Sequence, residues 1–188
     1  MPDRNNQSGD GFDGEDTAED RKTLDQLFSV TYEELRRLAS SVKRGDPKAT
    51  LNPTALVNEA WVKLAQSPHF AATSRLHFKR IAARAMRQVL VEAARRRNAE
   101  KRGGQAAIFI TFDESLMPVD SEEELLGLDT ALDTLSQVQP RQAMMVESRF
   151  FGGLEFTEIA DLLEVSEATI LRDWRAAKAW LGQELRKR

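Results

Sequence analysis

Apolar residues recur three or four positions apart along most of this chain, the spacing that places them on one face of an α-helix. Alternation of apolar and polar residues, the pattern of a half-buried strand, is confined to the stretch from Ile108 to Phe112. The pattern therefore predicts an all-α fold. Helices are predicted over residues 24–42, 53–66, 75–102, 125–135, 140–151, 156–163 and 167–185.

These helices fall into two groups, separated by residues 103–124, which lack periodicity and are rich in glycine and acid. We interpret this stretch as a flexible linker between two small helical domains, residues 23–102 and residues 125–188. The first 20 residues hold seven acids against one arginine and almost no large apolar side chains. Because such a composition buries too little apolar surface to fold, residues 1–22 are predicted to be a disordered acidic tail.

The end of the chain carries the signature of a helix-turn-helix. Phe156 to Leu163 has the pattern of a short amphipathic helix, Ser166 is a typical N-cap, and Glu167 favours the positive end of a helix dipole. Glu164 stands in the turn, where glycine is common because φ is often positive. The second helix then carries one apolar stripe, which comprises Ile170, Trp174, Ala177, Leu181 and Leu185.

The opposite face of this second helix is suited to DNA. Small residues allow close approach to a major groove, and arginine can pair with guanine or hold a phosphate. The alternative is an ordinary pair of packed helices with a solvated polar side. The face and its flanks comprise Ser166, Ala168, Thr169, Arg172, Arg175, Ala176, Lys178 and Ala179.

The formal net charge of −3 averages over segments of opposite sign. Residues 75–102 hold ten Lys or Arg against two Glu, a net charge of +8, whereas residues 113–133 hold eight acids and no base. Arg80, Arg84 and Arg87 share one side of the predicted basic helix. Such a row can follow a phosphate backbone, and the alternative is a solvated charged face. The inward stripe of the same helix comprises Phe78, Ala82, Ala85 and Val89.

Two ring-bearing residues, His69 and Phe70, stand in the predicted loop ahead of the basic helix. Either ring can stack on an unpaired base, which favours contact with single-stranded nucleic acid. Equally, either residue could serve only to anchor the loop. The loop is therefore a second candidate contact beside the arginine row.

Composition argues against several classes of protein. No apolar run approaches the length of a membrane span, and the absence of cysteine excludes disulfides, thiolate metal sites and cysteine nucleophiles. The chain has two histidines and no glycine-rich phosphate loop, so an enzymatic function is not indicated. We expect a cytoplasmic protein without a metal or a cofactor.

Four stretches of sequence are specific in combination. They are Tyr32 to Ala39 (YEELRRLA), Asn52 to Trp61 (NPTALVNEAW), Ala82 to Arg87 (AARAMR) and Arg172 to Arg175 (RDWR). Together with the acidic linker between two DNA-reading elements, they resemble a bacterial extracytoplasmic-function (ECF) sigma factor. This is the two-domain class of RNA polymerase specificity subunit, and the resemblance covers about residues 24–185.

The resemblance implies that the chain binds the β′ and β subunits of core RNA polymerase and promoter DNA. The implied contacts with core polymerase are Leu56, Val57, Glu59, Trp61 and Lys63. The implied contacts with the minus-10 element, which would be melted by capture of a flipped base, are His69, Phe70, Ser74, Arg75, Lys79, Arg80, Arg84 and Arg87. The implied contacts with the minus-35 element are Ser166, Ala168, Thr169, Arg172, Arg175 and Lys178.

One departure from the family pattern concerns regulation. Many ECF members carry an acidic cluster just before the Leu-Val pair that is here Leu56-Val57, whereas this chain has Asn52 to Ala55 (NPTA). A phosphate on Thr54 would supply negative charge at a helix N-terminus, where anions are stabilised. We therefore hypothesise activation by a Ser/Thr kinase. The alternatives are that Thr54 is only a helix-start residue and that an anti-sigma factor controls the protein.

Two other functions stay open from the sequence. A stand-alone helix-turn-helix regulator would explain residues 125–185 equally well, but it leaves the row of Arg80, Arg84 and Arg87 without a role. A helical adaptor with no DNA role would explain the helices alone. Promoter-specific transcription with core polymerase distinguishes the sigma factor from the stand-alone regulator.

Overall fold

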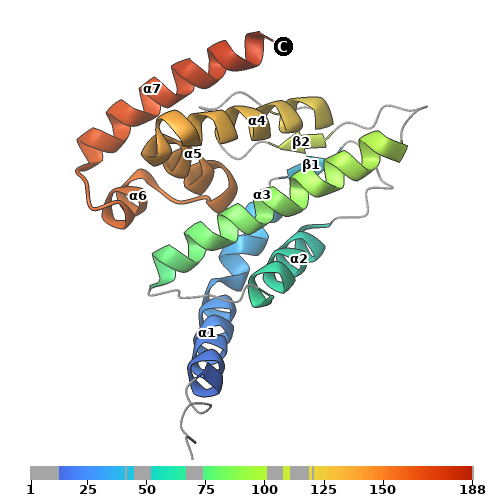
Figure 1. Ribbon diagram of the computed structural model, residues 1–188, viewed down its shortest axis with the longest axis vertical. Coiled ribbons are helices and arrows are strands. Elements are labelled where there is room, and N and C mark those ends of the chain that lie inside the picture. The colour runs from blue at the N-terminus through green and yellow to red at the C-terminus, as the bar shows by residue number, and fades with distance from the viewer. Residues whose placement is uncertain are drawn as a thin grey trace, which may run out of the picture.

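The structure is a computed structural model that describes residues 13–40, 42–44, 52–66, 74–100, 108–110, 119 and 121–187. This part of the chain forms seven helices and one pair of short strands (Figure 1). The N-terminal half contains α1 (Asp13–Ser40), β1 (Val42–Arg44), α2 (Pro53–Ala65) and α3 (Arg75–Glu100). The C-terminal half contains α4 (Glu122–Val138), α5 (Pro140–Gly152), α6 (Phe156–Leu162) and α7 (Glu167–Arg186), with β2 (Ile108–Ile110) between the halves in sequence.

The predicted helices are confirmed, except that Val42, predicted to end the first helix, begins β1. Local capping explains where several helices begin and end. The Asn52 side chain accepts a hydrogen bond of 2.7 Å from the Ala55 N–H, with Pro53 in the first turn of α2. Ser121 caps α4 in the same way at 3.1 Å from the Glu124 N–H, so α4 begins slightly before the predicted position. Gly153 ends α5 with a φ of 60°, in the left-handed region that glycine adopts without strain.

The all-α prediction omits the antiparallel pair of β1 and β2, in which Val42 lies opposite Ile110 and Arg44 opposite Ile108. Most of the predicted flexible linker lies outside the described residues, but β2 falls within it. Its Ile-Phe-Ile sequence suits a strand, because β-branched and aromatic residues fit a pleated surface. The pairing therefore ties the segment after α3 to the segment after α1.

The predicted disordered tail also needs correction, because α1 begins at Asp13 and residues 13–22 are helical. The sequence of this stretch is acidic, and acidic residues are favourable near a helix N-terminus. The same negative charge that suggested disorder therefore favours the start of a helix here. Residues 1–12 of the predicted tail lie outside the described residues.

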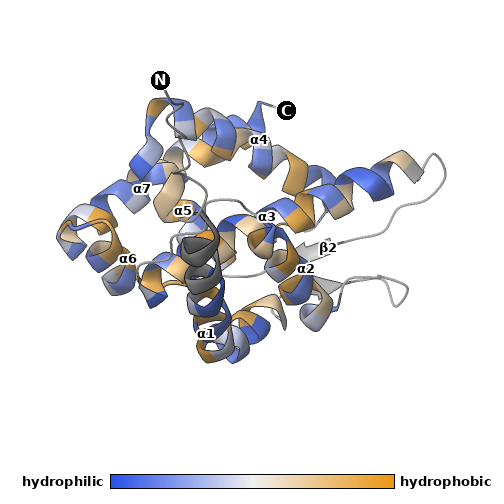
Figure 2. Cartoon of the chain, turned by 60° about the horizontal axis from the view of Figure 1, so that its bottom comes forward, coloured by the Kyte–Doolittle hydropathy of each residue, from blue (hydrophilic) through white to orange (hydrophobic). Residues whose placement is uncertain are grey.

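Helix α3 is shared by both halves of the molecule. One side packs against α1 and α2, and another side packs against α4 and α5 (Figure 1). The predicted inward stripe is buried as expected, but a second set of α3 residues is buried too. That second set comprises Lys79, Ala83, Leu90, Val91 and Ala94. One continuous apolar cluster therefore runs through both halves, and the more polar sides of the helices face outward (Figure 2).

Two adjacent glycines allow the end of α5 to come close to the N-terminal half. A Cβ atom on Gly152 would lie 2.9 Å from the Cβ of Ala83 and 2.8 Å from the Cδ1 of Leu154. A Cβ on Gly153 would lie 2.9 Å from the Cδ1 of Leu38 on α1. The absence of side chains at these two positions thus sets how closely α5 approaches α3 and α1.

Gly152→Ala is expected to lower the free energy of unfolding by about 1–3 kcal/mol, the usual range for overpacking a filled core. Gly182→Ala is the control, because a Cβ there has its nearest neighbour 4.0 Å away, at Nη1 of Arg186. Alanine should stabilise the interior of α7 at that position by about 0.5–1 kcal/mol. Urea denaturation of the two variants measures both effects. Equal stability of Gly152→Ala and the unsubstituted protein would contradict the close approach.

Candidate nucleic-acid interface

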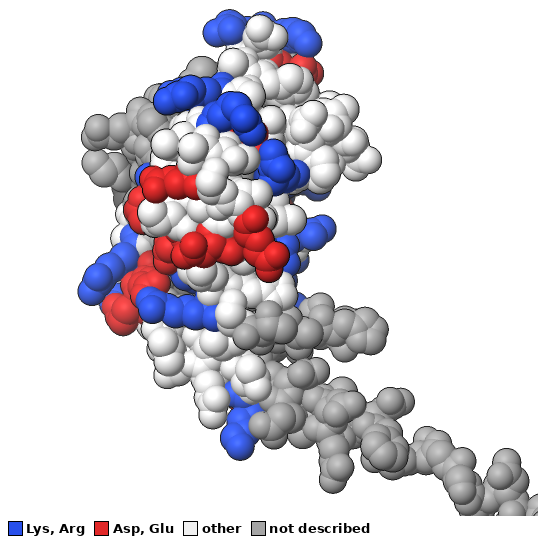
Figure 3. Space-filling model, turned by 90° about the vertical axis from the view of Figure 1, so that its left-hand side faces the viewer, with Lys and Arg blue, Asp and Glu red and all other residues white. Residues whose placement is uncertain are grey.

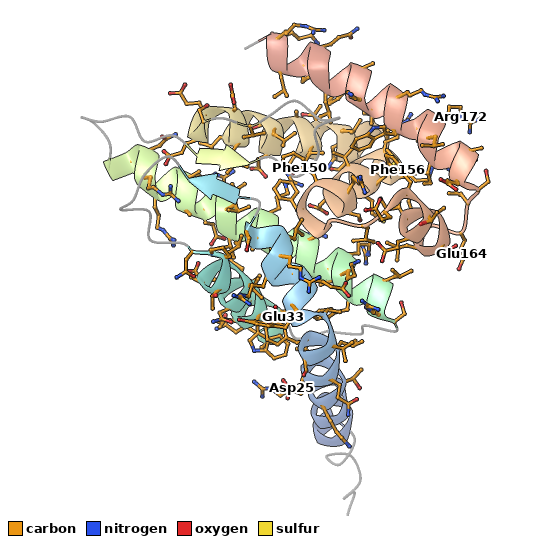
Figure 4. All side chains as sticks on the ribbon, turned by 180° about the vertical axis from the view of Figure 1, so that it is seen from behind. Asp25, Glu33, Phe150, Phe156, Glu164 and Arg172 are labelled. Atoms are coloured by element: carbon orange, nitrogen blue, oxygen red, sulfur yellow. The ribbon has the colours of Figure 1, made fainter. Side chains whose placement is uncertain are left out.

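The face of α7 that sequence analysis assigned to DNA is exposed. Ser166, Ala168, Arg172, Arg175 and Lys178 are all exposed, whereas Thr169 is half-buried. The predicted stripe on the other side is buried, except that Leu185 is half-buried. Arg172 lies on the outer side of α7 (Figure 4). The outer side of the helix therefore presents arginines among small residues, so the helix can enter a major groove.

Several contacts fix the orientation of α7 from its buried side. The Arg141 side chain of α5 holds the buried Asp173 carboxylate, with Nε and Nη2 at 2.8 and 2.7 Å from Oδ2. The rings of Phe156 and Trp174 meet edge to face at 5.3 Å, and the Arg149 guanidinium lies 4.9 Å from the centre of the Phe156 ring. Sequence analysis missed the role of Arg141, because the partner carboxylate lies 32 positions away.

The turn before α7 matches the predicted geometry. Ser166 caps the helix by accepting a hydrogen bond of 3.2 Å from the Thr169 N–H. Glu164 has a φ of 53°, the left-handed conformation expected at this position, which costs a side chain other than glycine about 1–2 kcal/mol. Exposed acids also surround this end of the molecule, and Figure 3 shows them as a band below the basic side chains of α7.

The basic helix α3 is less accessible than its sequence suggested. Arg84 is exposed, and Ser74 and Arg75 are exposed at the helix start, where Arg75 pairs with Glu34 of α1. Arg80 is half-buried, with Nη2 at 2.9 Å from Nε2 of His77. The predicted outward row is therefore only partly free in this conformation.

Arg87 departs furthest from the predicted outward position. Its side chain is 13% exposed, and its guanidinium contacts three carboxylates of the C-terminal half: Asp129, Asp133 and Glu147. Burial lowers the pKa of Arg87, but the hydrogen bond to Glu147 and the charge of Asp129 raise it. Because these two effects together exceed that of burial, the pKa lies above its ordinary value. The arginine therefore stays charged, and the packing of α4 and α5 on this side of α3 explains its burial.

Lys79 is likewise enclosed. Its side chain is 7% exposed, and its Nζ lies 2.9 Å from Oε1 of Glu158 on α6 and 3.5 Å from Oε2 of Glu34 on α1. A buried ammonium is tolerable only when it is paired, and here two carboxylates from opposite halves supply the pairing. Lys79 thus joins the halves in this conformation and lies away from solvent.

The helix assigned to polymerase docking needs a partial correction. Leu56 and Val57 are each 1% exposed and belong to the core, because they face α1 and α3. Glu59 is exposed, Trp61 is half-buried and stacks on Phe28 at 4.3 Å, and Lys63 pairs with Glu92 of α3 at 2.8 Å. Thus Leu56 and Val57 hold α2 in place, and the other three remain near the surface.

Sequence analysis also missed Val62, which is 50% exposed on the outer side of α2. A large apolar side chain so exposed on a fixed helix can contribute apolar area to an interface. The helical spacing gives a signal for it, because Val62 lies three positions after the exposed Glu59.

Thr54 is exposed at the second residue of α2, next to the capped N-terminus. His69 and Phe70, the residues expected to meet an unpaired base, lie outside the described residues. Ser74, also assigned to the minus-10 contact, accepts a hydrogen bond of 3.2 Å from the His77 N–H and so begins α3. Among the described helices, none combines the length and apolar character needed to cross a membrane.

Comparison with known families gives one match, to the model described as "ECF sigma factor", over residues 14–187. Neither the curated proteins nor the solved structures give a match. The family match spans both halves of the structure, from α1 to the end of α7, and is not restricted to the region of α6 and α7.

Glu158 gives a pH-dependent test of the contact between the halves. Burial raises its pKa, but the hydrogen bond from the Glu155 N–H and the ammonium of Lys79 outweigh burial and leave the pKa below its ordinary 4.5. The contribution to stability is therefore complete above pH 4.5 and is lost as the pH falls through the lowered pKa.

Glu158→Gln is expected to lower the melting temperature at neutral pH and to flatten its decline below pH 4.5. Thermal unfolding across pH measures this. Glu33→Gln is the control, because Glu33 pairs with Arg36 of its own helix at an exposed site, and such a pair contributes little to stability. Parallel pH curves for Glu158→Gln and the unsubstituted protein would contradict the assignment.

Proposed function

The chain belongs to the ECF sigma factor family, and on that premise we propose that it directs core RNA polymerase to promoters through two DNA contacts. The exposed polar face of α7 would read the minus-35 element, and α3 with its preceding loop would hold the melted minus-10 element. The observation that carries this proposal is the fixed orientation of α7, whose buried side is anchored by Arg141 and whose outer side presents Arg172 and Arg175. Proteins of this family bind core polymerase and promoter DNA and are often controlled by anti-sigma factors.

The division of labour follows the two halves. Residues 23–102 would form the part that docks on polymerase and melts the minus-10 element, and residues 125–188 would form the minus-35 reader. Arg84, Ser74 and Arg75 are exposed already and would contact the DNA backbone first. Lys79, Arg80 and Arg87 would join them only after their present partners are displaced.

The proposed polymerase contact is the outer side of α2. Glu59, Trp61 and Lys63 remain candidates, with Val62 as an apolar addition, whereas Leu56 and Val57 act by positioning the helix. The outer side thus mixes charge with an apolar centre, the usual composition of a protein interface with a polar rim.

A stand-alone regulator is the second candidate, and one observation favours it: the α7 face is exposed without any rearrangement. Such a regulator would bind duplex DNA alone and would need another sigma factor for transcription. The proposed sigma factor, in contrast, would start promoter-specific transcription when it is the only specificity subunit added to core polymerase.

Arg172→Ala combined with Arg175→Ala should reduce transcription from a minus-35-dependent promoter at least about tenfold, because one good arginine contact to a base is worth about 1–3 kcal/mol. Core binding should not change. Lys187→Ala is the control, since Lys187 is exposed beyond the end of α7 and pairs with Glu184. Run-off transcription with purified core measures the effect. Loss of core binding together with transcription would contradict the assigned role.

We further propose that phosphorylation of Thr54 strengthens polymerase docking. Thr54 is exposed in the first turn of a helix that has no acid in that turn, so a phosphate there would meet the positive end of the helix dipole. The added charge would replace the acidic cluster that many family members carry.

Thr54→Glu should bind core polymerase about fivefold more tightly than Thr54→Ala, because one charge pair at an interface rim is worth up to roughly 1 kcal/mol. Gln66→Glu is the matched control, since it adds the same charge at the opposite end of α2, where the dipole disfavours it. Equal affinities for Thr54→Glu and Thr54→Ala, measured by fluorescence anisotropy, would end the phosphorylation proposal.

A further inference from the structure

Basic side chains of α3 meet acids of the C-terminal half at four places along the helix. Lys79 pairs with Glu158 at 2.9 Å, and Arg87 pairs with a group of three carboxylates. Farther along, Arg95 contacts Asp129 at 3.1 Å and Arg97 contacts Glu122 at 3.2 Å. The partners of the basic helix thus come from α4, α5 and α6, which lie beside it in Figure 1.

Arg87 has the largest number of acidic partners in this set, and each of its three guanidinium nitrogens donates a hydrogen bond to the C-terminal half. Nε lies 2.9 Å from Oδ1 of Asp129, and Nη1 lies 3.0 Å from Oε1 of Glu147. Nη2 lies 2.6 Å from Oδ1 of Asp133 and 2.8 Å from the carbonyl oxygen of Asp129. Carboxylates in this arrangement present oxygens to the guanidinium as a phosphate would.

This geometry makes two roles of Arg87 mutually exclusive. A phosphate oxygen needs the same N–H groups that Asp129, Asp133 and Glu147 now occupy. The exposed side chains of Arg84 and Arg95 line a hollow of about 220 Å³, and the three acids around Arg87 line it too. Those acids would repel a phosphate backbone that approached Arg84, so the C-terminal half opposes DNA at α3 by occupation and by charge.

We propose that this structure is a closed, autoinhibited form, in which the acids of α4 and α5 take the place of DNA phosphates on α3. The proposal rests on the proposed function, because it assumes that α3 is a DNA contact. Closure hides the α3 contact only, since the α7 face is exposed in the same form. Opening then requires that the C-terminal half leave α3, which binding to core polymerase would drive.

The chemistry of the contact suits a reversible interface. Desolvation offsets much of the attraction in a buried ion pair, and interfaces between parts of one chain that separate are more polar than cores. Asp133 is still 69% exposed on its side chain, so water and salt reach the edge of the cluster. Apolar residues of α3 and α5 also pack together at this boundary, where a Cβ on Gly152 would lie 2.9 Å from the Cβ of Ala83.

The test compares two charge-matched double variants. Asp129→Asn with Glu147→Gln removes two of the three carboxylates on Arg87 without altering any residue assigned to DNA. Asp25→Asn with Glu33→Gln makes the same chemical change on exposed residues of α1, away from the C-terminal half (Figure 4). Because the chain has no cysteine, Asn58→Cys and Gln183→Cys, both at exposed positions, accept a donor and an acceptor dye for energy transfer.

The Asp129→Asn, Glu147→Gln protein should show reduced energy transfer between α2 and α7. It should also bind a labelled single-stranded DNA of mixed sequence on the order of tenfold more tightly than the control, since closure divides the intrinsic dissociation constant by the open fraction and so weakens binding. Adding Arg84→Ala should remove this gain. With core polymerase, both double variants should transcribe equally, because core binding opens both.

Two results would overturn the autoinhibited form: unchanged energy transfer, or reduced transfer without a gain in DNA binding. Either result with normal transcription leaves the proposed function standing, whereas absence of transcription by the unsubstituted protein with core would reject that function instead. Circular dichroism shows whether the double variant folds. If it does not, the single variants Glu147→Gln and Glu33→Gln give the same comparison with a smaller expected gain in DNA affinity. Equal DNA affinity of these two single variants would also overturn the proposal.

Discussion

The guanidinium of Arg87, enclosed by carboxylates from α4 and α5, marks the constraint on which the arrangement of the molecule depends: α3 serves as a core helix for both halves. Its apolar residues face α1 and α2 on one side and α4 and α5 on another. A helix that is buried on two sides has little exposed surface left for charged side chains. Those that remain, such as Lys79, must find partners at the boundary, and acids of the opposite half provide them.

The two proposed DNA contacts consequently differ in how accessible they are in this structure. The face of α7 is supported from behind by the Arg141 to Asp173 pair and is exposed, so binding there would need no rearrangement. Most of the α3 contact is engaged within the chain. A closed molecule would thus recognise a duplex through α7 before α3 became available. An opening step would then separate recognition of the duplex from capture of the single strand.

Sequence predicted the parts of this structure that depend on near neighbours. The cap at Ser166, the positive φ at Glu164 and the buried stripe of α7 all arise within one short segment, and the structure contains them. The burial of Arg87 depends on residues more than 40 positions away, so a single-helix pattern could only place it opposite the apolar stripe. Leu56 and Val57 illustrate the same limit, because the family motif marks them without distinguishing a contact from a core position.

The cost of opening comes from two kinds of contact, the ion pairs around Arg87 and the apolar contacts of α5 with α3. Releasing the arginine to water restores its hydration and that of the three carboxylates, which returns much of the attraction lost. Releasing it to DNA replaces carboxylate oxygens with phosphate oxygens, so its hydrogen bonds are exchanged and not lost. The apolar contacts of α5 with α3 have no such replacement. They would therefore set most of the opening cost, while the ion pairs determine which surface of α3 is hidden and make closure sensitive to salt.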